Sequence, residues 1–402
     1  MRFAILTQYY PPEMGAPQAR LSELARRFVE RGHHVYVMTA MPNYPRGQVY
    51  PGYGGVYKRE NQNGVTVIRS YIYPTKSVTK VKRLSNYFSF VGSSLVAGAA
   101  ALPRVDFIMT ESPPLFLGIT GYLLSRLRRT RWIFNVSDLW PESAVRLGVI
   151  GEGASLELAK KLEAFCYRHA WLVTGQSREI LQNLRQRFPR ANTYHLSNGV
   201  DTQFFHPANR SDEWRQQIAK STDCVVLYAG LHGIAQGLDQ VLEAAQQLRD
   251  LKRLRIVLVG DGPEKAALIN KCDRLALKNV EFRDPCERER MPGLLASADI
   301  AIVPLKLRIP GAVPSKLYEA MGAGLPVVLL ANGEAARVVR EAEAGIVVEP
   351  GDVSGLIMAL RNLAENPKQR MQMGKNGRAV ALRQFDRKTI ADRFIDYLEC
   401  HM

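Results

Sequence analysis

"GAVPSKLYEAMGAGLPVV", residues 311–328, combines the signals for a loop, a helix and a buried strand in immediate succession. A helix is predicted to begin near Pro314, because the N–H that proline lacks would have no partner in the first turn. Gly322 and Gly324 are predicted to break it, and the apolar run from Leu325 indicates a buried strand. The stretch therefore predicts the helix-then-strand order of an α/β protein.

Two charged residues of this stretch form a candidate binding site. Lys316 and Glu319 lie three residues apart, so their side chains leave the predicted helix on one face, beside the unpaired N–H groups of its first turn. The ammonium and N–H groups suit the phosphates of a nucleoside diphosphate, and the carboxylate suits its ribose hydroxyls. The alternative interpretation is a surface ion pair between the two residues, which contributes little to stability.

Short apolar runs alternate with helical patterns along the whole chain. Examples are RFAILT, HHVYVMTA and RWIFNVSD in the first half, and CVVLYAG, LRIVLVGDG and DIAIVPL in the second. Continuous apolar strands separated by helices indicate parallel sheets covered on both faces, so the two series predict two Rossmann-like doubly wound domains. The turn-rich segment 195–210 is the expected connection. Ligands of such sheets bind beyond the carboxyl ends of the strands.

The positive charge is concentrated in the first half of the chain. The 402 residues carry a formal charge of +16, with 26 Lys and Arg against 12 Asp and Glu in residues 1–200 and 28 against 26 in the remainder. A basic half suits nucleic acid, anionic lipid or a phosphorylated substrate, or is a solvated face without a partner. The sequence shows no recognised nucleic-acid-binding motif, and its aromatic residues are not interleaved with the charges, so nucleic acid is the weakest of these partners.

Composition and cysteine usage narrow the class of protein. A content of 46% hydrophobic and 23% charged residues is that of an ordinary globular protein. The five cysteines include no CxxC pair, which predicts a reducing compartment and no zinc site. The first residues pass from a short apolar strand directly into a turn and a helix, without the apolar region of a signal peptide, so we expect a cytoplasmic protein.

An ordered set of motifs carries a family resemblance. The set comprises YYPPEMGAPQARLSELARRFVERGHHVYVMTA, FNVSDLWPESAVRLG, LSNGVDTQFFHP, YAGLHGIAQGLDQVLEAAQQL, LVGDGPEK and PSKLYEAMGAGLPVV. Over nearly its full length the chain resembles the retaining GT-B glycosyltransferases of family 4, in the branch that builds capsule, O-antigen and exopolysaccharide. The resemblance implies two Rossmann-like domains facing a central cleft. Residues 1–200 would bind the acceptor and 201–380 the nucleotide-sugar donor, and a helix at 381–402 would cross back to the first domain.

The resemblance also implies an activity. A hexose or N-acetylhexosamine would pass from a nucleotide-diphosphate donor, expected to be a UDP-sugar, to a polyprenol-diphosphate-linked saccharide during synthesis of a bacterial surface polysaccharide. We expect no metal cofactor, since cations and helix N-termini serve the departing diphosphate and no plausible loop contains a DxD-type cluster. The alternatives are a nucleotide-sugar epimerase or phosphorylase of the same architecture, and a basic nucleic-acid-binding protein. A nicotinamide-dependent oxidoreductase is weaker still, because no GxGxxG follows the first strand.

The sequence departs from the family pattern at several positions. The first glutamate of the EX7E motif falls on Gly311, so only the second, Glu319, is present. Many members place two cations in the loop after the first strand of the donor domain, where this chain has Leu231 and Gln236. The histidine of the acceptor-side motif corresponds to Ser137. The diphosphate would therefore depend on other cations and on backbone N–H groups.

The candidate catalytic residues are Asp138 and Lys316. Asp138 follows the predicted strand RWIFNV at the end where sites form, so it would hold or polarise the acceptor hydroxyl, or else cap the next helix. Glu111 ends another predicted strand and is interpreted as a turn residue. The retaining family implies front-face substitution assisted by the leaving phosphate, without a protein nucleophile. The candidate donor-binding residues are Gly15, Gly230, His232, Gly233, Lys306, Arg308, Ser315, Lys316, Leu317, Glu319 and Glu334.

Residues 84–103 carry no charge, but their serines and an asparagine make them poor candidates for membrane insertion. Apolar residues recur at helical spacing and lysines precede them, which predicts a helix on an anionic membrane surface. The alternative is a helix that faces the core of the first domain. A lipid-linked acceptor would explain both the apolar stripe and the charge, so we expect a peripheral position on the inner face of the cytoplasmic membrane. The stripe comprises Leu84, Tyr87, Phe88, Val91 and Leu95, and the basic residues are Lys76, Lys80, Lys82 and Arg83.

Overall fold

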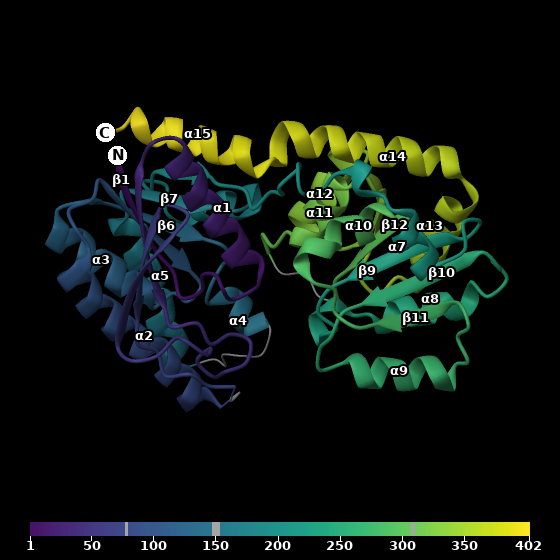
Figure 1. Ribbon diagram of the computed structural model, residues 1–402, viewed down its shortest axis with the longest axis horizontal. Helices are drawn as coiled ribbons and strands as arrows, with labels where there is room; N and C mark the ends of the chain where they lie inside the picture. The colour runs from purple at the N-terminus through teal and green to yellow at the C-terminus, as the bar shows by residue number, and fades with distance from the viewer. Residues whose placement is uncertain (77–78, 147–152, 307–309) are drawn as a thin grey trace. The chain divides into compact units, whose positions relative to one another are not determined.

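The computed structural model describes residues 1–76, 79–146, 153–306 and 310–402, so Arg308 lies outside the described residues. The chain forms two compact units (Figure 1). The first comprises Met1–Asn198 together with Arg387–Met402, and the second comprises Gly199–Asp386. Each unit has its own sheet and its own hydrophobic core.

The first unit is built on an eight-stranded sheet in the order β3-β4-β2-β1-β5-β6-β7-β8. Its pairings are parallel except for that of β3 with β4, which is antiparallel. The strands are β1 (Arg2–Leu6), β2 (His34–Ala40), β3 (Tyr57–Gln62), β4 (Val65–Ser70), β5 (Phe107–Ser112), β6 (Arg131–Val136), β7 (Leu172–Gly175) and β8 (Thr193–His195). The central strands β1 and β5 are buried along nearly their whole length, as sheets covered on both faces require.

Helices cover both faces of this sheet. The helices are α1 (Ala16–Glu30), α2 (Lys80–Ala101), α3 (Leu117–Arg128), α4 (Glu142–Arg146), α5 (Ala154–His169), α6 (Arg178–Arg187) and α15 (Arg387–Glu399). On one face Phe3 of β1 stacks on Phe28 of α1 with ring centroids 4.2 Å apart, and Phe394 of α15 meets both rings edge-on. On the other face α2 and α3 pack over the same strands.

The last helix belongs to the first unit and begins later than expected. Arg387 donates hydrogen bonds of 2.9 Å to both carboxylate oxygens of Glu23, and Arg27 binds Asp392 at 2.7 Å, so charge pairs fix α15 beside α1. The preceding residues Ala381–Phe385 form a π-helical turn at the end of α14 (Pro367–Val380), and its first and last residues, Ala381 and Phe385, are buried in the core of the second unit. The expected start at residue 381 therefore precedes the true start of this helix.

The second unit has a six-stranded sheet in the order β11-β10-β9-β12-β13-β14, with parallel pairings throughout. Its strands are β9 (Cys224–Ala229), β10 (Leu254–Val259), β11 (Val280–Arg283), β12 (Ile300–Pro304), β13 (Val327–Leu330) and β14 (Gly345–Val348). Its helices besides α14 are α7 (Asp212–Ile218), α8 (Asp239–Gln247), α9 (Lys265–Arg274), α10 (Met291–Ala296), α11 (Ser315–Gly322), α12 (Gly333–Glu341) and α13 (Val353–Glu365).

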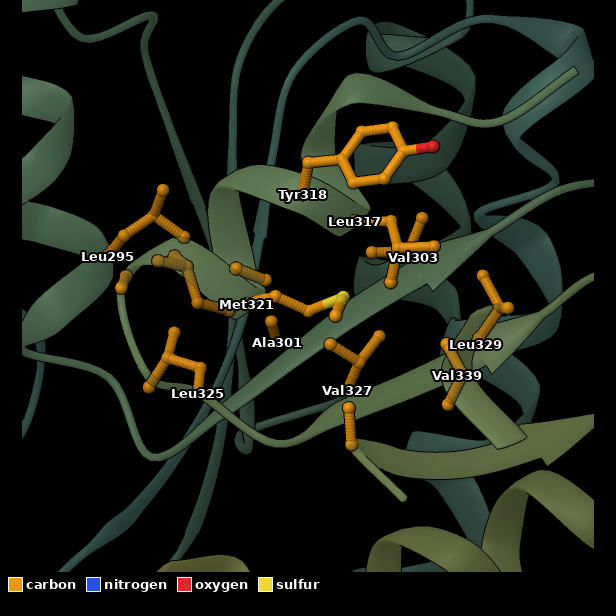
Figure 2. Packing of buried hydrophobic residues seen from close by; sticks show 14 of the residues in the cluster. Leu295, Ala301, Val303, Leu317, Tyr318, Met321, Leu325, Val327, Leu329 and Val339 are labelled. Carbon is orange, nitrogen blue, oxygen red and sulfur yellow. The ribbon is translucent and has the colours of Figure 1, made fainter. Parts of the chain in front are cut away.

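Helix α11 is held by one apolar face. Figure 2 shows Leu317 and Met321 lying against side chains of β12 and β13, and both residues are fully buried. Burying two such side chains contributes about 1.5–3 kcal/mol each. Because Lys316 and Glu319 leave the helix elsewhere, both remain only half-buried. The core thus decides which side of α11 is available for binding.

The strand order places this helix near a topological switch point. β9 has β10 on one side and β12 on the other, so the connections that leave β9 and β12 diverge at the carboxyl ends of these strands. In doubly wound sheets ligands bind at such a point. The loop after β12 is tied to the loop after β9 by a 2.8 Å hydrogen bond from the N–H of Lys306 to the carbonyl of Ala235.

The helices of the described residues include none that combines the length and the apolar character needed to cross a membrane.

Candidate functional site

The candidate donor site lies around the amino group of Lys316. Gly230, the first residue after β9, has φ +147°, and a Cβ built on it would lie 2.1 Å from Lys316 Cε and 2.5 Å from Nζ. Glycine is therefore required here both for the backbone conformation and for the space that the lysine occupies. On the same side, Nζ lies 5.5 Å from the centre of the Tyr228 ring. The structure brings the predicted Gly230 and Lys316 into direct contact.

The amino group of Lys316 is not neutralised by a carboxylate. Among the described residues no ion pair within 4.0 Å joins it to any Asp or Glu, Glu319 included. The alternative of a surface ion pair between these two residues is therefore wrong. Burial lowers the pKa of Lys316, and the charge of Glu319 opposes this shift only in part. A bound anion would raise the pKa of the amine again, so the site favours an anionic ligand.

The first turn of α11 adds backbone donors to this amine. Pro314 precedes the helix in an extended conformation, and the helix begins at Ser315. The first N–H groups of a helix have no acceptor within it, and the helix dipole favours negative charge at this end. The N–H groups of Ser315 and Lys316 are therefore donors in the same helical turn that carries the ammonium group. Leu317 is different, because its side chain is fully buried in the core, so a donor contact through that side chain is not available.

His232 lies in the loop after β9 and stabilises it from the buried side. Its side chain is fully buried between Tyr228 and Phe282, and neither ring nitrogen has a hydrogen-bond partner in the described structure. Burial lowers its pKa, which favours the neutral imidazole. Its backbone N–H donates to Asp261 at 2.8 Å, which ties the loops after β9 and β10 together. The predicted contact between His232 and a phosphate is therefore not available, because the imidazole ring is not accessible to solvent.

The other donor candidates lie around this loop with different exposure. Gly233 precedes the 3₁₀ turn Ile234–Gln236, and Lys306 has an exposed side chain. Glu334, in the first turn of α12, is buried and binds Arg337 at 2.5 Å. Its carboxylate is therefore already engaged by a cation.

A second polar cluster, the Glu111 network, lies at the carboxyl ends of strands in the first unit. Glu111 of β5 binds Arg20 of α1 at 2.6 Å and accepts a 2.6 Å hydrogen bond from Asn135 of β6. Ser137 donates to the same carboxylate and accepts a 2.5 Å hydrogen bond from Gln176. Glu111 and Arg20 are each at most 5% exposed, so this is a buried charge pair. The interpretation of Glu111 as a turn residue is wrong.

Asp138 lies directly after Ser137 of this network. Burial, and then the negative charge of Glu111, raise its pKa to about 6, while Arg20 acts in the opposite direction. A carboxyl group with this pKa can exchange a proton with a hydroxyl near neutral pH. Arg20 was missed in the sequence. The only available signal was its position one residue before the buried apolar stripe of α1, which is weak evidence for a role in a site.

Gly15 is the exposed N-cap residue of α1, and its φ of 164° is extended backbone that any residue adopts. A Cβ there would lie 2.5 Å from Gln18 Oε1, which is the end of a flexible side chain. The structure therefore gives no conformational reason for glycine at this position, and Gly15 stays a candidate for donor contact by resemblance alone.

Helix α2 has two apolar sides, so the residues of the predicted single stripe do not all lie on one side of the helix. Phe90 and Val91 are buried against the sheet, whereas Phe88 is 47% exposed. Tyr87 and Leu95 are half-buried. The exposed stripe comprises Val81, Leu84, Phe88 and Val96. One side of the helix faces the core, as the alternative interpretation expected, and the other side faces solvent. Binding of the exposed side to a membrane stays a prediction. Lys82 is exposed, Arg83 is half-buried, and the side chain of Lys80 lies outside the described residues.

Comparison with protein families agrees with this two-domain arrangement. The family described as "Glycosyl transferase 4-like domain" matches residues 15–199, and "Glycosyl transferases group 1" matches residues 210–380. The putative colanic acid biosynthesis glycosyl transferase WcaI of Escherichia coli K12 is 30% identical over 410 residues, which cover 98% of this chain and 99% of the relative. A GDP-mannose-dependent phosphatidylinositol monomannoside mannosyltransferase of Mycolicibacterium smegmatis is 26% identical and matches 73% of this chain and 85% of its own.

Solved structures share the fold at lower identity. Sucrose-phosphate synthase from Thermosynechococcus elongatus superimposes with a TM-score of 0.79 at 19% identity, covering 99% of this chain and 98% of its own. HepE from Anabaena, solved in complex with UDP, has a TM-score of 0.74 at 21% identity and covers the whole of both chains.

Proposed function

The chain belongs to the group 1 glycosyltransferases and has their GT-B fold, and from this premise we propose a more specific activity. It transfers a hexose or N-acetylhexosamine from a UDP-sugar to a polyprenol-diphosphate-linked saccharide, with retention of the anomeric configuration, during synthesis of a bacterial surface polysaccharide. The similarity to a putative colanic acid biosynthesis glycosyl transferase supports the role in polysaccharide synthesis. The UDP complex of a structural neighbour supports the donor.

The observation that carries the proposal is the unneutralised amine of Lys316 against Gly230 at the N-terminus of α11. Cleavage of the bond between sugar and diphosphate leaves negative charge on the departing phosphate. The ammonium group and the N–H groups of the first turn meet that charge without needing to reorganise. Glu319, on the same helix, would accept hydrogen bonds from the ribose hydroxyls. This set of groups needs no metal ion to stabilise the leaving group.

Retention follows in this proposal from attack on the face that the diphosphate leaves. Asp138 would hold the acceptor hydroxyl, and an oxygen of the departing phosphate would accept its proton as the new glycosidic bond forms. No covalent sugar–protein intermediate is required. The raised pKa of Asp138 suits a group that shares a proton with a hydroxyl near neutral pH.

Calorimetric titration of UDP, GDP and ADP tests the donor site. We expect UDP to bind, and to bind at least tenfold more weakly to Lys316→Ala and to Glu319→Ala, a loss of about 1.4 kcal/mol or more. Lys368→Ala is the matched control, because Lys368 is exposed on α14. Equal weak binding of all three nucleotides, unaffected by either substitution, would refute this donor site. If GDP binds most tightly, the proposed donor is a GDP-sugar instead of a UDP-sugar, as for the GDP-mannose-dependent relative.

The reaction itself separates the transferase from its alternatives. We expect release of UDP to require a lipid-linked saccharide, and proton NMR of the product to show the anomeric configuration of the donor. Conversion of the donor without acceptor would identify an epimerase. An inverted product would remove the retaining mechanism but leave the transferase assignment intact.

We further propose that the exposed stripe of α2 rests on the membrane that carries the acceptor. An apolar helix side near basic residues binds an anionic surface, where each Lys or Arg contributes about 1 kcal/mol. We expect the protein to float with phosphatidylglycerol vesicles but not with phosphatidylcholine vesicles, and Leu84→Ser/Phe88→Ser to lose this binding. If the double variant floats like the wild type, the stripe is not a membrane surface.

A further inference from the structure

A small cavity lies within the first unit, between the loops after β1 and β2 and the beginning of α2. Its volume is about 220 Å³, and no residue of the Glu111 network lines it. Pockets that enclose drug-sized ligands span roughly 300–1,000 Å³. A volume of this size suits one sugar ring with a phosphate group.

Two cations line this cavity without a counter-ion. Lys76 comes from the segment before α2, and Arg83 comes from its first turns. The lining contains no Asp or Glu, and among the described residues neither cation has a carboxylate within 4.0 Å. The basic side chains that pack α15 against α1 are, in contrast, paired with carboxylates. Two unpaired cations at one cavity leave it electropositive and suited to an anion.

The rest of the lining suits a sugar. Tyr9 and Tyr44 meet edge-on with ring centroids 5.5 Å apart, and Tyr87 of α2 also lines the cavity. Tyrosine offers an apolar ring face together with a hydroxyl, which matches the C–H faces and hydroxyl groups of a pyranose. Asn86 adds a fixed amide, because its Nδ2 donates to the carbonyl of Tyr73 at 2.7 Å and its Oδ1 accepts from Gln8 at 2.9 Å.

The loop that carries Tyr44 is held in place from below. The buried carboxylate of Glu13 accepts hydrogen bonds of 2.7 Å from the N–H groups of both Asn43 and Tyr44. Gly47 has φ +62°, and a Cβ there would lie 2.3 Å from Lys76 Cγ. Glycine at this position therefore lets the loop and Lys76 approach each other. The cavity is formed by fixed backbone and not by exposed side chains alone.

We propose that this cavity binds a sugar phosphate ester, with the phosphate between Lys76 and Arg83 and the sugar ring against the tyrosines. The inference rests on the proposed function, since a lipid-linked saccharide joins its first sugar to the lipid through phosphate. The helix that supplies Arg83 and Tyr87 to the cavity also exposes Leu84 and Phe88. A lipid attached to the phosphate would continue along that exposed side of α2.

Titration of the full-length protein with glucose 1-phosphate tests the proposal, with inorganic phosphate and methyl glucoside as the two partial ligands. We expect glucose 1-phosphate to bind more tightly than either. Lys76→Ala and Arg83→Ala should each weaken it by about tenfold, and Tyr87→Ala by a smaller factor. Arg104→Ala is the matched control, because Arg104 is an exposed arginine of the same unit outside the lining. Circular dichroism melts establish that each variant is folded.

Two further measurements distinguish the possible failures. UDP binding, measured on the same samples, should stay unchanged in these variants. If the wild-type protein binds glucose 1-phosphate but not UDP, the proposed UDP-sugar donor is wrong and the proposed sugar phosphate site still stands. Binding to phosphatidylglycerol vesicles separates a lipid surface from a sugar phosphate site. If Lys76→Ala and Arg83→Ala lose vesicle binding while the wild type fails to bind glucose 1-phosphate, the cations serve the membrane surface and the proposal is overturned. Equal binding by the wild type and both variants overturns it as well.

Discussion

The two candidate sites differ in how their central cation is compensated. Arg20 of the first unit binds the buried carboxylate of Glu111 at 2.6 Å, so its charge is already neutralised in the folded protein. Lys316 of the second unit lies against Gly230, without a carboxylate within 4.0 Å among the described residues. The first cation therefore stabilises protein structure, whereas the second is available to a ligand. The contrast teaches that a partly buried cation is informative only once its partners are known.

The largest effect is expected from breaking the neutralised pair. Glu111→Gln keeps the size of the side chain but leaves the Arg20 charge buried and uncompensated, so we expect a loss of about 3–5 kcal/mol in the free energy of unfolding. Urea denaturation measures it. Glu157→Gln is the control, since Glu157 forms an exposed pair with Lys160 and should change stability by less than about 1 kcal/mol. Equal effects of the two substitutions would show that the Glu111 network contributes no special stability.

The next effect concerns the space that Lys316 occupies. Gly230→Ala places a methyl group where Lys316 Cε and Nζ lie, so we expect UDP affinity to fall at least tenfold, or about 1.4 kcal/mol. Gly54→Ala is the matched control, because nothing lies within 4 Å of a Cβ at that position. Calorimetry measures both variants. If the Gly230→Ala protein is folded and binds UDP as tightly as the wild type, Lys316 is not part of the donor site.

A smaller effect is expected in the pH dependence of the reaction. The pKa of Asp138 is raised from 3.8 to about 6, so the group is protonated below that pH and charged above it. If the charged form holds the acceptor hydroxyl, kcat/KM for the acceptor should rise with pH through a midpoint near 6.

The raised pKa of Asp138 also determines the sign of the change in stability with pH, and substitutions can test it. Because the folded state binds the proton more tightly than the unfolded state, this group makes the protein less stable as pH rises from about 4 to 6. Glu111→Gln removes the neighbouring negative charge and should move the midpoint of the activity profile to lower pH. Asp138→Asn should abolish the rise of kcat/KM with pH near 6. A profile identical in all three proteins would exclude Asp138 from the acceptor step.

The smallest effect is expected from removing metal ions. Lys316 and the first turn of α11 supply positive charge and N–H donors for the leaving diphosphate. Activity should therefore survive dialysis against EDTA within about twofold. A large loss that Mg²⁺ restores would show that the amine alone does not compensate the departing phosphate.

Local patterns predicted the secondary structure around the donor site well. Pro314 and Gly322 mark the beginning and end of α11 to within one residue, because both residues act through their own backbone. The periodicity of α2 predicted a helix but assigned Val91 to the wrong side. Periodicity reveals that a helix has an apolar side, but which neighbouring element covers that side is not a local property.

The sequence by itself determined the family and the two α/β sheets, because alternating apolar runs and ordered motifs are local properties of the chain. Only the tertiary structure decided the partners of the charged groups. Arg20 and Glu111 stand 91 positions apart in sequence, and they meet because α1 packs over the sheet that contains β5. Lys316 and Glu319 stand three apart, yet the space beside Gly230 keeps the amine free of the carboxylate. Charge compensation depends on distance in the folded protein, and sequence separation does not determine that distance.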